Sequence, residues 1–231
     1  MIDIGANIGL TSCQSGAKFS EVHMFEPNPN ALGILKINAN IALRGHNYTI
    51  HEYALGAQAE RLKLYVPYDK WGGAFIDSAQ NDYELNLHSQ NNGFGPFNPA
   101  NYDIFDVQVE PAQDKLAQLF QQLSAQNKKL GVVKIDAEGY EDFIIEALLK
   151  SLPADFKLFI VYENWNTKPF AFESRPGLVL EVFNLFERRS VFQHAPRWLN
   201  SILISLQGSI KTSLVPVKGN LFPGTFVIQV N

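Results

Sequence analysis

The sequence predicts a single α/β domain built on a mostly parallel sheet. Short apolar segments of strand type alternate with segments of helical periodicity along the 231 residues, and this alternation is typical of parallel strands joined by helices. Several of the apolar strands end in an acidic residue or a glycine-rich turn. Because ligands bind at the carboxyl ends of the strands in such sheets, these ends are the first place to look for a site.

The first half of the chain divides into strand, helix, strand, helix, strand and strand. A short strand and a glycine-rich turn open the sequence, and a helix is predicted at about residues 8–19. Asn28 and Pro29 then supply a helix cap and a first-turn proline. The other elements expected in this half are strand 22–26, helix 29–43, strand 48–55 and strand 61–66.

A long segment at residues 77–106 is rich in Asn, Gly, Pro and aromatic residues and shows little periodicity. Loops of this length are uncommon in compact domains and often form lids or binding loops. We interpret it as a loop insertion within one domain, because no repeat, linker or low-complexity tail divides residues 1–231. The elements expected after it are strand 107–109, helix 116–123, strand 130–135, helix 141–151, strand 156–162, helix 179–186 and closing strands 202–206 and 225–230.

The composition excludes several classes of protein. Hydrophobic residues make up 46% and charged residues 18% of the chain, an ordinary globular balance. The formal net charge of -4 argues against a nucleic-acid binder that relies on phosphate neutralisation. No apolar run is long enough for a membrane span, and no signal-peptide pattern opens the chain. We therefore expect a cytoplasmic protein, and the sequence makes no prediction of its oligomeric state.

The glycine turn after the first strand is the most informative motif. It reads Asp3-x-Gly5-x-x-x-Gly9, whereas a turn that binds a dinucleotide prefers G-x-G-x-x-G. Asp3 would repel a pyrophosphate, but it suits a cationic ligand such as S-adenosylmethionine, which carries a sulfonium and an ammonium and no phosphate. Glu26 ends the second strand, where a carboxylate can accept both ribose hydroxyls. A dinucleotide site shares the ribose contact, so Asp3 and the glycine spacing are what favour S-adenosylmethionine.

Four stretches in this order resemble the FkbM-type methyltransferases. They are MIDIGANIGLTS, VHMFEPNPNALGILKINANIAL, YALGAQAERLKLYVP and VVKIDAEGYEDFIIEAL. The resemblance covers roughly residues 2–163 and implies a Rossmann-like, seven-stranded class I methyltransferase fold with helices on both faces of the sheet. It also implies an S-adenosylmethionine-dependent enzyme acting mostly on hydroxyl oxygens. Family members usually carry helical structure before the first strand, so the resemblance implies an N-terminally shortened member.

The resemblance also assigns roles to matching residues. Five residues of the glycine turn would surround the methionine part of the cofactor, and Glu26 would hold the ribose. Two residues at the end of the third strand would lie near the adenine, and Asp136 would face the methionine ammonium or the substrate hydroxyl. The turn residues are Asp3, Gly5, Ala6, Asn7 and Gly9, and the adenine-side pair is Ala54 and Leu55.

Methyl transfer to an alcohol needs positioning and a general base. Asp136 is the first candidate for the base and Glu138 the second, and in an extended segment these two acids share a face. Glu138 also fits an acid that stabilises a helix start through the helix dipole. Glu163 follows another strand end, and Trp71 follows a predicted strand, so we expect both near the substrate.

A metal site is an alternative at the same edge of the sheet. Asp136 with Glu163 and Asn164 loosely resembles the metal-binding pattern of catechol-type O-methyltransferases. Oxygen ligands of this kind suit Mg²⁺. We predict no metal, because the last acid is Glu here and the FkbM-type family is not generally metal-dependent.

The predicted function is methyl transfer from S-adenosyl-L-methionine to a hydroxyl of a small polar acceptor, such as a sugar or glycan precursor. The insertion would close over the acceptor, and His88 within it is a candidate contact. One alternative is a catalytically inactive S-adenosylmethionine-binding module of the same fold. Another is an NAD-dependent oxidoreductase, which Asp3 and the missing third glycine disfavour.

Overall fold

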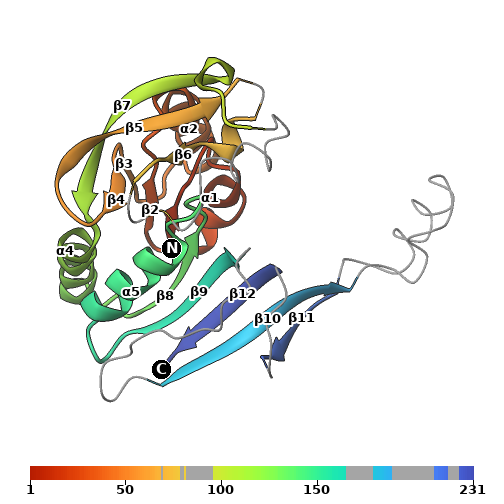
Figure 1. Ribbon diagram of the computed structural model, residues 1–231. Coiled ribbons are helices and arrows are strands. Elements are labelled where there is room, and N and C mark those ends of the chain that lie inside the picture. Colours follow the sequence, from red (N-terminus) through yellow and green to blue (C-terminus); the bar gives the residue numbers. More distant parts are fainter. Residues whose placement is uncertain (69, 79–80, 82–95, 165–178, 189–210, 218–223) are drawn as a thin grey trace, which may run out of the picture.

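The computed structural model describes residues 1–68, 70–78, 81, 96–164, 179–188, 211–217 and 224–231 (Figure 1). In these ranges, α-helices alternate with strands through the first two thirds of the chain. The helices are α1 (Leu10–Ser15), α2 (Pro29–Ala42), α4 (Ala112–Ala125) and α5 (Glu141–Ser151). The strands are β1 (Ile2–Ile4), β2 (Val22–Phe25), β3 (Tyr48–His51), β4 (Ala54–Gly56), β5 (Glu60–Pro67), β6 (Phe75–Ile76), β7 (Tyr102–Pro111), β8 (Leu130–Ile135), β9 (Lys157–Asn164), β10 (Leu180–Arg188), β11 (Lys211–Pro216) and β12 (Gly224–Val230).

The larger sheet has eight strands among the described residues, in the order β11-β10-β12-β9-β8-β1-β2-β3. The pairs joining β3, β2, β1, β8 and β9 are parallel, and those joining β9, β12, β10 and β11 are antiparallel. The predicted seven-stranded, mostly parallel sheet is therefore wrong in strand number. It also lacks the antiparallel pairing of β9, β12, β10 and β11. The parallel half carries the strand ends that the sequence singled out.

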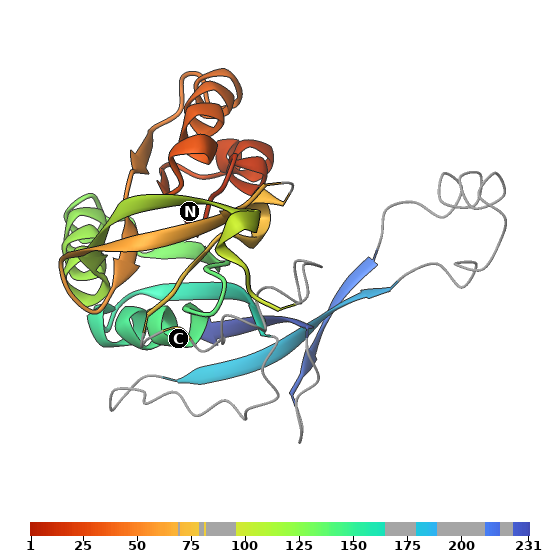
Figure 2. The same ribbon diagram turned by 45° about the horizontal axis from the view of Figure 1, so that its top comes forward.

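Residues 180–188 form β10, where a helix was predicted. The spacing of Val182, Phe183 and Phe186 fits a helix, but β-branched and aromatic residues also favour strands. Pairing on both sides decides the outcome, because β10 lies between β11 and β12. Strands β10 and β11 extend away from the body of the molecule (Figure 2). The predicted strand 225–230 is confirmed as β12, and predicted strand 202–206 lies outside the described residues.

A second sheet of four strands, in the order β4-β7-β5-β6, corrects two boundaries. The predicted strand 48–55 is divided, because β3 joins the large sheet while β4 pairs with β7. Strand β7 begins at Tyr102, so the end of the predicted insertion is regular structure. Strands β5 and β7 form a long curved ribbon at the top of the molecule (Figure 1).

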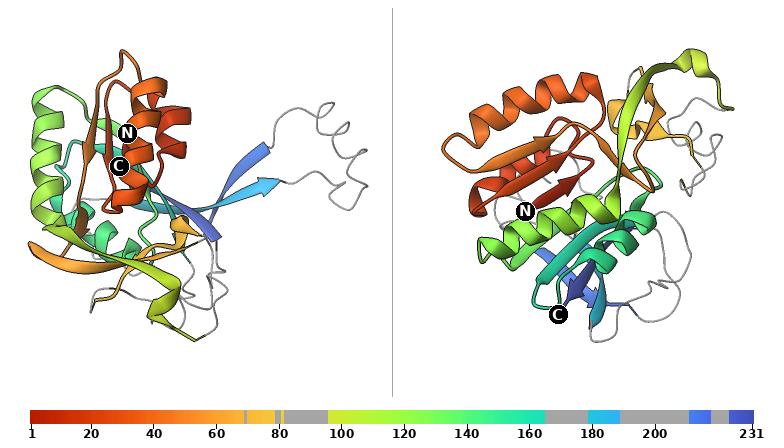
Figure 3. Two further views of the ribbon diagram at one scale, coloured as in Figure 1. Left: turned by 90° about the horizontal axis from the view of Figure 1, so that it is seen from above. Right: turned by 90° about the vertical axis from the view of Figure 1, so that its left-hand side faces the viewer.

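Helices cover both faces of the parallel strands, as predicted. Ile2 and Ile4 of β1 belong to one core cluster with α4 and α5, while Val22 and Met24 of β2 pack in another with α2. Figure 3 shows the strands between α4 on one side and α1 and α2 on the other. Asp3 lies between the two isoleucines, so strand alternation places it on the α1 side.

The first predicted helix is shorter than expected. It is α1 followed by a 3-10 turn at Gly16–Lys18, in place of one helix at residues 8–19. Helix α2 begins as predicted: the Asn28 side chain caps it by accepting a hydrogen bond from the Asn30 amide, and Pro29 follows in the first turn. No helix in the described part of the chain is long and apolar enough to cross a membrane.

Candidate active site

The sheet topology places a cavity where the chain changes direction. From β1 the chain proceeds to β2 and β3 on one side, while the adjacent β8 leads to β9 on the other. The loops after such neighbouring strands separate, which leaves a crevice at their carboxyl ends. A cavity of about 850 Å³, including open solvent at its mouth, lies there. It is lined by residues that follow β1, β2, β3 and β8 and by residues of the second sheet.

Two glycines of the first turn are required by backbone geometry. Gly5 has φ of +74°, and a Cβ there would lie 1.8 Å from the carbonyl oxygen of Asp136. Gly9 has φ of +84°, and a Cβ there would lie 2.5 Å from Leu35. The Gly5 and Ala6 amides both donate to the Phe25 carbonyl at 3.0 Å. The turn is thereby held between the ends of β2 and β8, close to the cavity.

Gly5→Ala is expected to lower the free energy of unfolding by about 2–3 kcal/mol. The positive φ costs an alanine about 1–2 kcal/mol, and the overlap with Asp136 adds a comparable strain. Gly33→Ala is the matched control, because Gly33 is exposed in α2 and nothing lies within 4 Å of an added Cβ. That variant should gain about 0.5–1 kcal/mol. Urea denaturation measures both, and an unchanged midpoint for Gly5→Ala would contradict the geometry.

Glu26 joins the glycine turn to the start of α2. Its side chain is only 6% exposed, and its two carboxylate oxygens accept hydrogen bonds from the Asn7 amide at 2.7 Å and the Asn28 amide at 2.8 Å. Burial raises the pKa of Glu26, and these two hydrogen bonds oppose the shift. Each oxygen retains a second lone pair, so the carboxylate can also accept from hydroxyls of a ligand in the cavity that it lines.

Asn7 presents a polar atom without a partner. It has φ of +50°, an uncommon conformation for a residue other than glycine. Its Oδ1 is buried and has no hydrogen-bond partner among the described residues, although the residue lines the cavity. A buried acceptor left unpaired costs about 1–3 kcal/mol. A ligand donor at this position would recover that energy.

Lys134 connects the glycine turn to two predicted acids, and the sequence reasoning missed it. Its Nζ donates to the Gly5 carbonyl at 2.8 Å and lies 3.3 Å from Asp3 and 3.1 Å from Asp136. Burial works against the charge, but the two carboxylates outweigh it and raise the pKa of Lys134. A lysine inside the apolar run 130–135 was the available signal, because a buried lysine needs a charged partner.

Asp3 takes part in this cluster from behind the cavity. It is fully buried and does not line the cavity, and Ser12 Oγ donates to its Oδ2 at 2.7 Å. The ion pair with Lys134 supplies the neighbouring charge. Asp3 therefore contacts a ligand in the cavity only through the residues that it holds.

The sequence predicts that Asp136 and Glu138 share a face of an extended segment after β8, and the structure shows that this prediction is wrong. Glu138 has φ of +41° and Gly139 φ of +98°, so the chain turns sharply before α5. The buried Glu141 carboxylate accepts from the Ala137 and Gly139 amides, each at 2.8 Å. These backbone contacts fix the turn, and both Asp136 and Glu138 still line the cavity.

Glu138 lines the cavity and has a strongly raised pKa. Burial, followed by the charges of Asp136 and Glu141, raises the pKa of Glu138 to about 8. Lys70 opposes the shift and Glu163 adds to it. Perturbed acids in clefts are frequent at catalytic sites, because a base that titrates near neutrality is an efficient proton acceptor.

The loop that follows β6 is tied to this turn. Ser78 Oγ hydrogen-bonds the Tyr140 hydroxyl, and Asn81 Nδ2 donates to the carbonyls of Ile76 at 2.8 Å and Glu138 at 3.2 Å. Beyond Asn81, residues 82–95 lie outside the described part of the chain. The start of the predicted insertion thus lies against the turn that carries Glu138.

The second sheet supplies an apolar wall of the cavity. Trp71 begins a 3-10 turn, Trp71–Gly73, that follows β5. A Cβ on Gly72 would lie 3.6 Å from the Asn7 side chain, so this turn sits against the glycine turn. The wall residues are Leu64, Trp71, Ala74, Phe75, Ile76 and Val109. An apolar wall facing a few fixed polar groups is typical of small-molecule sites.

Eight of the residues predicted from the sequence line this one cavity. They are Gly5, Asn7, Glu26, Ala54, Leu55, Trp71, Asp136 and Glu138. Asp3, Ala6 and Gly9 lie outside its lining, and Glu163 is exposed on β9. No group of three or more metal-ligating side chains occurs within the described ranges. The side chain of Asn164, and His88, lie outside them.

The sequence was compared with models of protein families and with curated proteins. A family model described as the methyltransferase FkbM domain matches residues 3–200. A search among curated proteins found no match.

Two solved structures are similar in part. The FkbM methyltransferase from Methylobacillus flagellatus KT is 20% identical over 69% of this chain and 32% of its own, with a TM-score of 0.35. This chain thus spans about a third of that relative. The precorrin 8W decarboxylase from Methanobacterium thermoautotrophicum is 11% identical over all of this chain and 80% of its own, with a TM-score of 0.40. These likenesses are too distant to argue from. The match of the family model over most of the sequence decides the assignment: the chain belongs to the FkbM methyltransferase domain family.

Proposed function

We propose that the chain is an S-adenosylmethionine-dependent O-methyltransferase that acts on a small polar acceptor. The observation that carries the proposal is the position of the Glu26 carboxylate, which lines the cavity beside the glycine turn at the switch point of the sheet. Carboxylates at this position accept hydrogen bonds from ribose hydroxyls. The turn lacks the glycine spacing of a pyrophosphate-binding turn, and S-adenosylmethionine is a nucleoside ligand without a phosphate. Together with the family membership, this makes S-adenosylmethionine the ligand that fits.

The residues present fit this cofactor. Glu26 would hold the ribose, and Gly5 and Asn7 would lie against the methionine portion, where the unpaired Asn7 Oδ1 accepts a donor such as an ammonium group. The apolar lining around Leu55 and Val109 suits the adenine. Lys134 neutralises part of the Asp3 and Asp136 charge, so the cluster keeps a net negative charge toward a cationic ligand.

When bound, S-adenosylmethionine supplies a methyl group activated by its sulfonium. The chain's part is to orient the acceptor and to take up the hydroxyl proton. We assign proton removal to Glu138 in place of Asp136, because Asp136 is paired with Lys134 and Glu138 has the raised pKa of about 8. The ionised Glu138 carboxylate would accept the hydroxyl proton and become the neutral acid, which keeps the proton inside the cavity.

The acceptor would enter between Trp71 and the turn that carries Glu138. Both residues line the cavity, and Trp71 is partly exposed. An aromatic face beside carboxylates suits a hydroxyl-bearing ring such as a sugar, which stacks on the indole and donates hydrogen bonds to the acids. Glu163, exposed on β9 and near enough to affect the Glu138 pKa, would lie at the outer end of this path.

Release of S-adenosylhomocysteine tests the activity. The protein would be incubated with S-adenosylmethionine and a pool of sugars and glycan precursors, and the product followed by mass spectrometry. The proposal predicts acceptor-dependent release together with a mass increase of one methylene on an acceptor. Binding of S-adenosylhomocysteine without turnover on any acceptor class would favour the inactive binding module.

The rate is expected to rise with pH. Glu138 acts as a base only when ionised, so kcat/KM for the cofactor should increase as pH rises and level off above about pH 8, the pKa of the free protein. Initial rates between about pH 6 and 10 measure the profile. A profile that is flat, or that falls through this range, would remove Glu138 as the base.

A further inference from the structure

One residue behind the cavity contacts three residues that line it, two through its side chain and one through its backbone carbonyl. The His51 ring stacks on Phe25 with 4.1 Å between ring centroids and 11° between planes. Its Nδ1 lies 3.3 Å from the Tyr53 hydroxyl, and its carbonyl accepts the Glu26 amide at 3.0 Å. Phe25, Glu26 and Tyr53 all line the cavity, whereas His51 does not. His51 thus lies where one residue can set the position of a whole wall.

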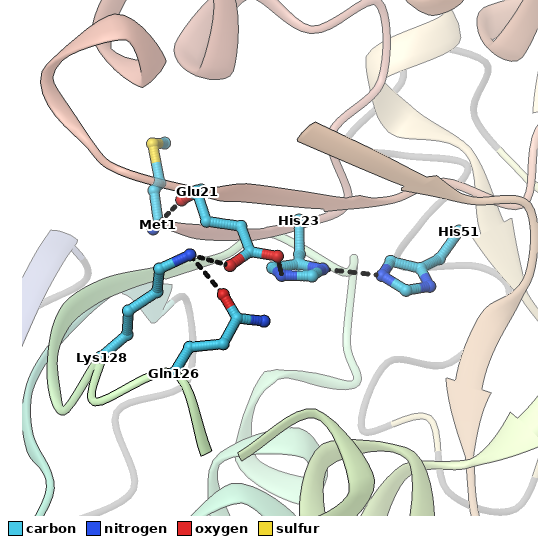
Figure 4. A network of polar contacts seen from close by, with 6 residues as sticks. All are labelled: Met1, Glu21, His23, His51, Gln126 and Lys128. Atoms are coloured by element: carbon cyan, nitrogen blue, oxygen red, sulfur yellow. Dashed lines mark hydrogen bonds and ion pairs between the residues drawn. The ribbon is translucent and has the colours of Figure 1, made fainter. Parts of the chain in front are cut away.

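His51 is the inner end of a chain of polar contacts that reaches toward α4 (Figure 4). His51 Nε2 lies 3.2 Å from His23 Nδ1, and His23 Nε2 lies 3.2 Å from Glu21 Oε1. The other Glu21 oxygen accepts from Lys128 Nζ at 2.5 Å. Figure 4 shows Glu21, His23 and His51 in one line, with Lys128 beside Glu21.

The Glu21 carboxylate decides which atoms donate and which accept along this series of polar contacts. Lys128 and His23 outweigh burial and lower the pKa of Glu21, so it is ionised at neutral pH. Burial lowers the pKa of both imidazoles, that of His51 to about 4, so both are neutral there.

Glu21 Oε1 lies 3.2 Å from His23 Nε2, a contact that lacks the geometry of a hydrogen bond. An ionised carboxylate attracts an N–H and repels a lone pair, so the neutral His23 carries its proton on Nε2. Its Nδ1 must then accept from His51 Nε2–H. The remaining lone pair, on His51 Nδ1, accepts from the Tyr53 hydroxyl. Each link fixes the next, and the Tyr53 hydroxyl becomes a donor directed at His51.

We propose that His51 is a positioning residue for the nucleoside-binding wall, and that Glu21 fixes its tautomer through His23. The inference rests on the proposed function, because it assigns the wall formed by Phe25, Glu26 and Tyr53 to the adenosine portion of the cofactor. In the alternative tautomer, His51 Nδ1–H faces the Tyr53 oxygen, and the hydroxyl must turn its proton elsewhere. The wall then loses the arrangement that the carboxylate enforces.

Calorimetric titration with S-adenosylhomocysteine tests the positioning. His51→Leu should weaken binding about tenfold, as expected for the loss of a hydrogen bond and a ring contact behind the wall. His46→Leu is the matched control, because His46 is exposed after α2, and it should bind as the wild type does. A double-mutant cycle with Tyr53→Phe should be non-additive, because the two side chains share one hydrogen bond. Equal affinity for His51→Leu and wild type, or an additive cycle, would overturn the proposal.

Nitrogen-15 NMR of labelled histidine tests the tautomers without any ligand. The proposal predicts that His23 and His51 are both neutral Nε2–H tautomers at neutral pH. In Glu21→Leu, which removes the acceptor, both should become tautomer mixtures while His46 is unchanged. Unchanged tautomers in Glu21→Leu would overturn the role of Glu21. Failure of the wild type to bind S-adenosylhomocysteine would instead count against the proposed function, and the NMR result would be unaffected by it.

Discussion

Glu26→Ala is expected to abolish detectable binding of S-adenosylhomocysteine. The substitution removes the proposed ribose ligand and also leaves the Asn7 and Asn28 amides without their acceptor. Each amide left unpaired in a buried position costs about 1–3 kcal/mol, and the Asn7 amide belongs to the turn that would contact the methionine portion. Both losses act on the same ligand, so the effect is larger than that of one missing hydrogen bond. Calorimetric titration measures the affinity.

A matched control separates binding from folding in this variant. Glu52 is an exposed glutamate near the same sheet edge and pairs only with Lys36 among the described residues, at 2.7 Å. Glu52→Ala should bind S-adenosylhomocysteine with wild-type affinity, because surface ion pairs contribute little to stability. Thermal unfolding would show whether Glu26→Ala remains folded at the titration temperature. Wild-type affinity in a folded Glu26→Ala would exclude Glu26 as the ribose ligand.

Glu138→Gln is expected to lower kcat by about 10²–10⁴-fold, the range found when a general base is removed. The amide keeps the size of the side chain but cannot take up the hydroxyl proton. Affinity for S-adenosylhomocysteine should change little, because the proton transfer concerns the acceptor. The rise of kcat/KM toward pH 8 should disappear in the variant, since it reports the ionisation of Glu138. Steady-state rates across the pH range measure both effects.

Asp136→Asn is the comparison that decides between the two acids. The sequence reasoning placed Asp136 first, while the structure pairs it with Lys134 at 3.1 Å. Its replacement should weaken cofactor binding through the Lys134 cluster and keep the rise with pH. The rise should move to lower pH, because the Asp136 charge contributes to the raised pKa of Glu138. If Asp136→Asn removes the rise with pH and Glu138→Gln keeps it, the base is Asp136 and not Glu138.

The sequence predicted the parts of the fold and site that local patterns determine. Strand β8, helix α5 and the cap of α2 follow from apolar periodicity and from Asn28-Pro29, which act over a few residues. The glycine turn and the acid that ends β2 are likewise local signals. Because parallel strands direct their carboxyl ends to one edge, Gly5, Glu26 and Asp136 could be expected to line one cavity.

The rest depends on contacts between distant segments. Strand β10 has a helical pattern, and only its pairing with β11 and β12 makes it a strand. The second sheet divides one predicted strand between β3 and β4 for the same reason. Lys134 gains its role from Asp3, 131 positions earlier (134 − 3), and from the Gly5 carbonyl. The residues that neighbour these positions in the sequence do not determine such contacts, so local patterns cannot predict them.

The environment of Glu138 could not be derived from spacing either. Two acids two positions apart share a face only in an extended segment, and the positive φ of Glu138 and Gly139 breaks that pattern. The raised pKa of Glu138 comes from burial and from the charges of Asp136, Glu141 and Glu163. The family resemblance named the right family, and the geometry then changed which acid is assigned as the base.

Calorimetric titration of the wild-type protein with S-adenosylhomocysteine, with NAD as a parallel ligand, tests the central claim most directly. The account predicts one site per chain with micromolar or tighter affinity for S-adenosylhomocysteine and no heat of binding with NAD. The turn has no third glycine at the spacing of a pyrophosphate-binding turn, and the buried carboxylate of Asp3 lies behind it. Binding of NAD, or no binding of S-adenosylhomocysteine at any accessible concentration, would contradict it.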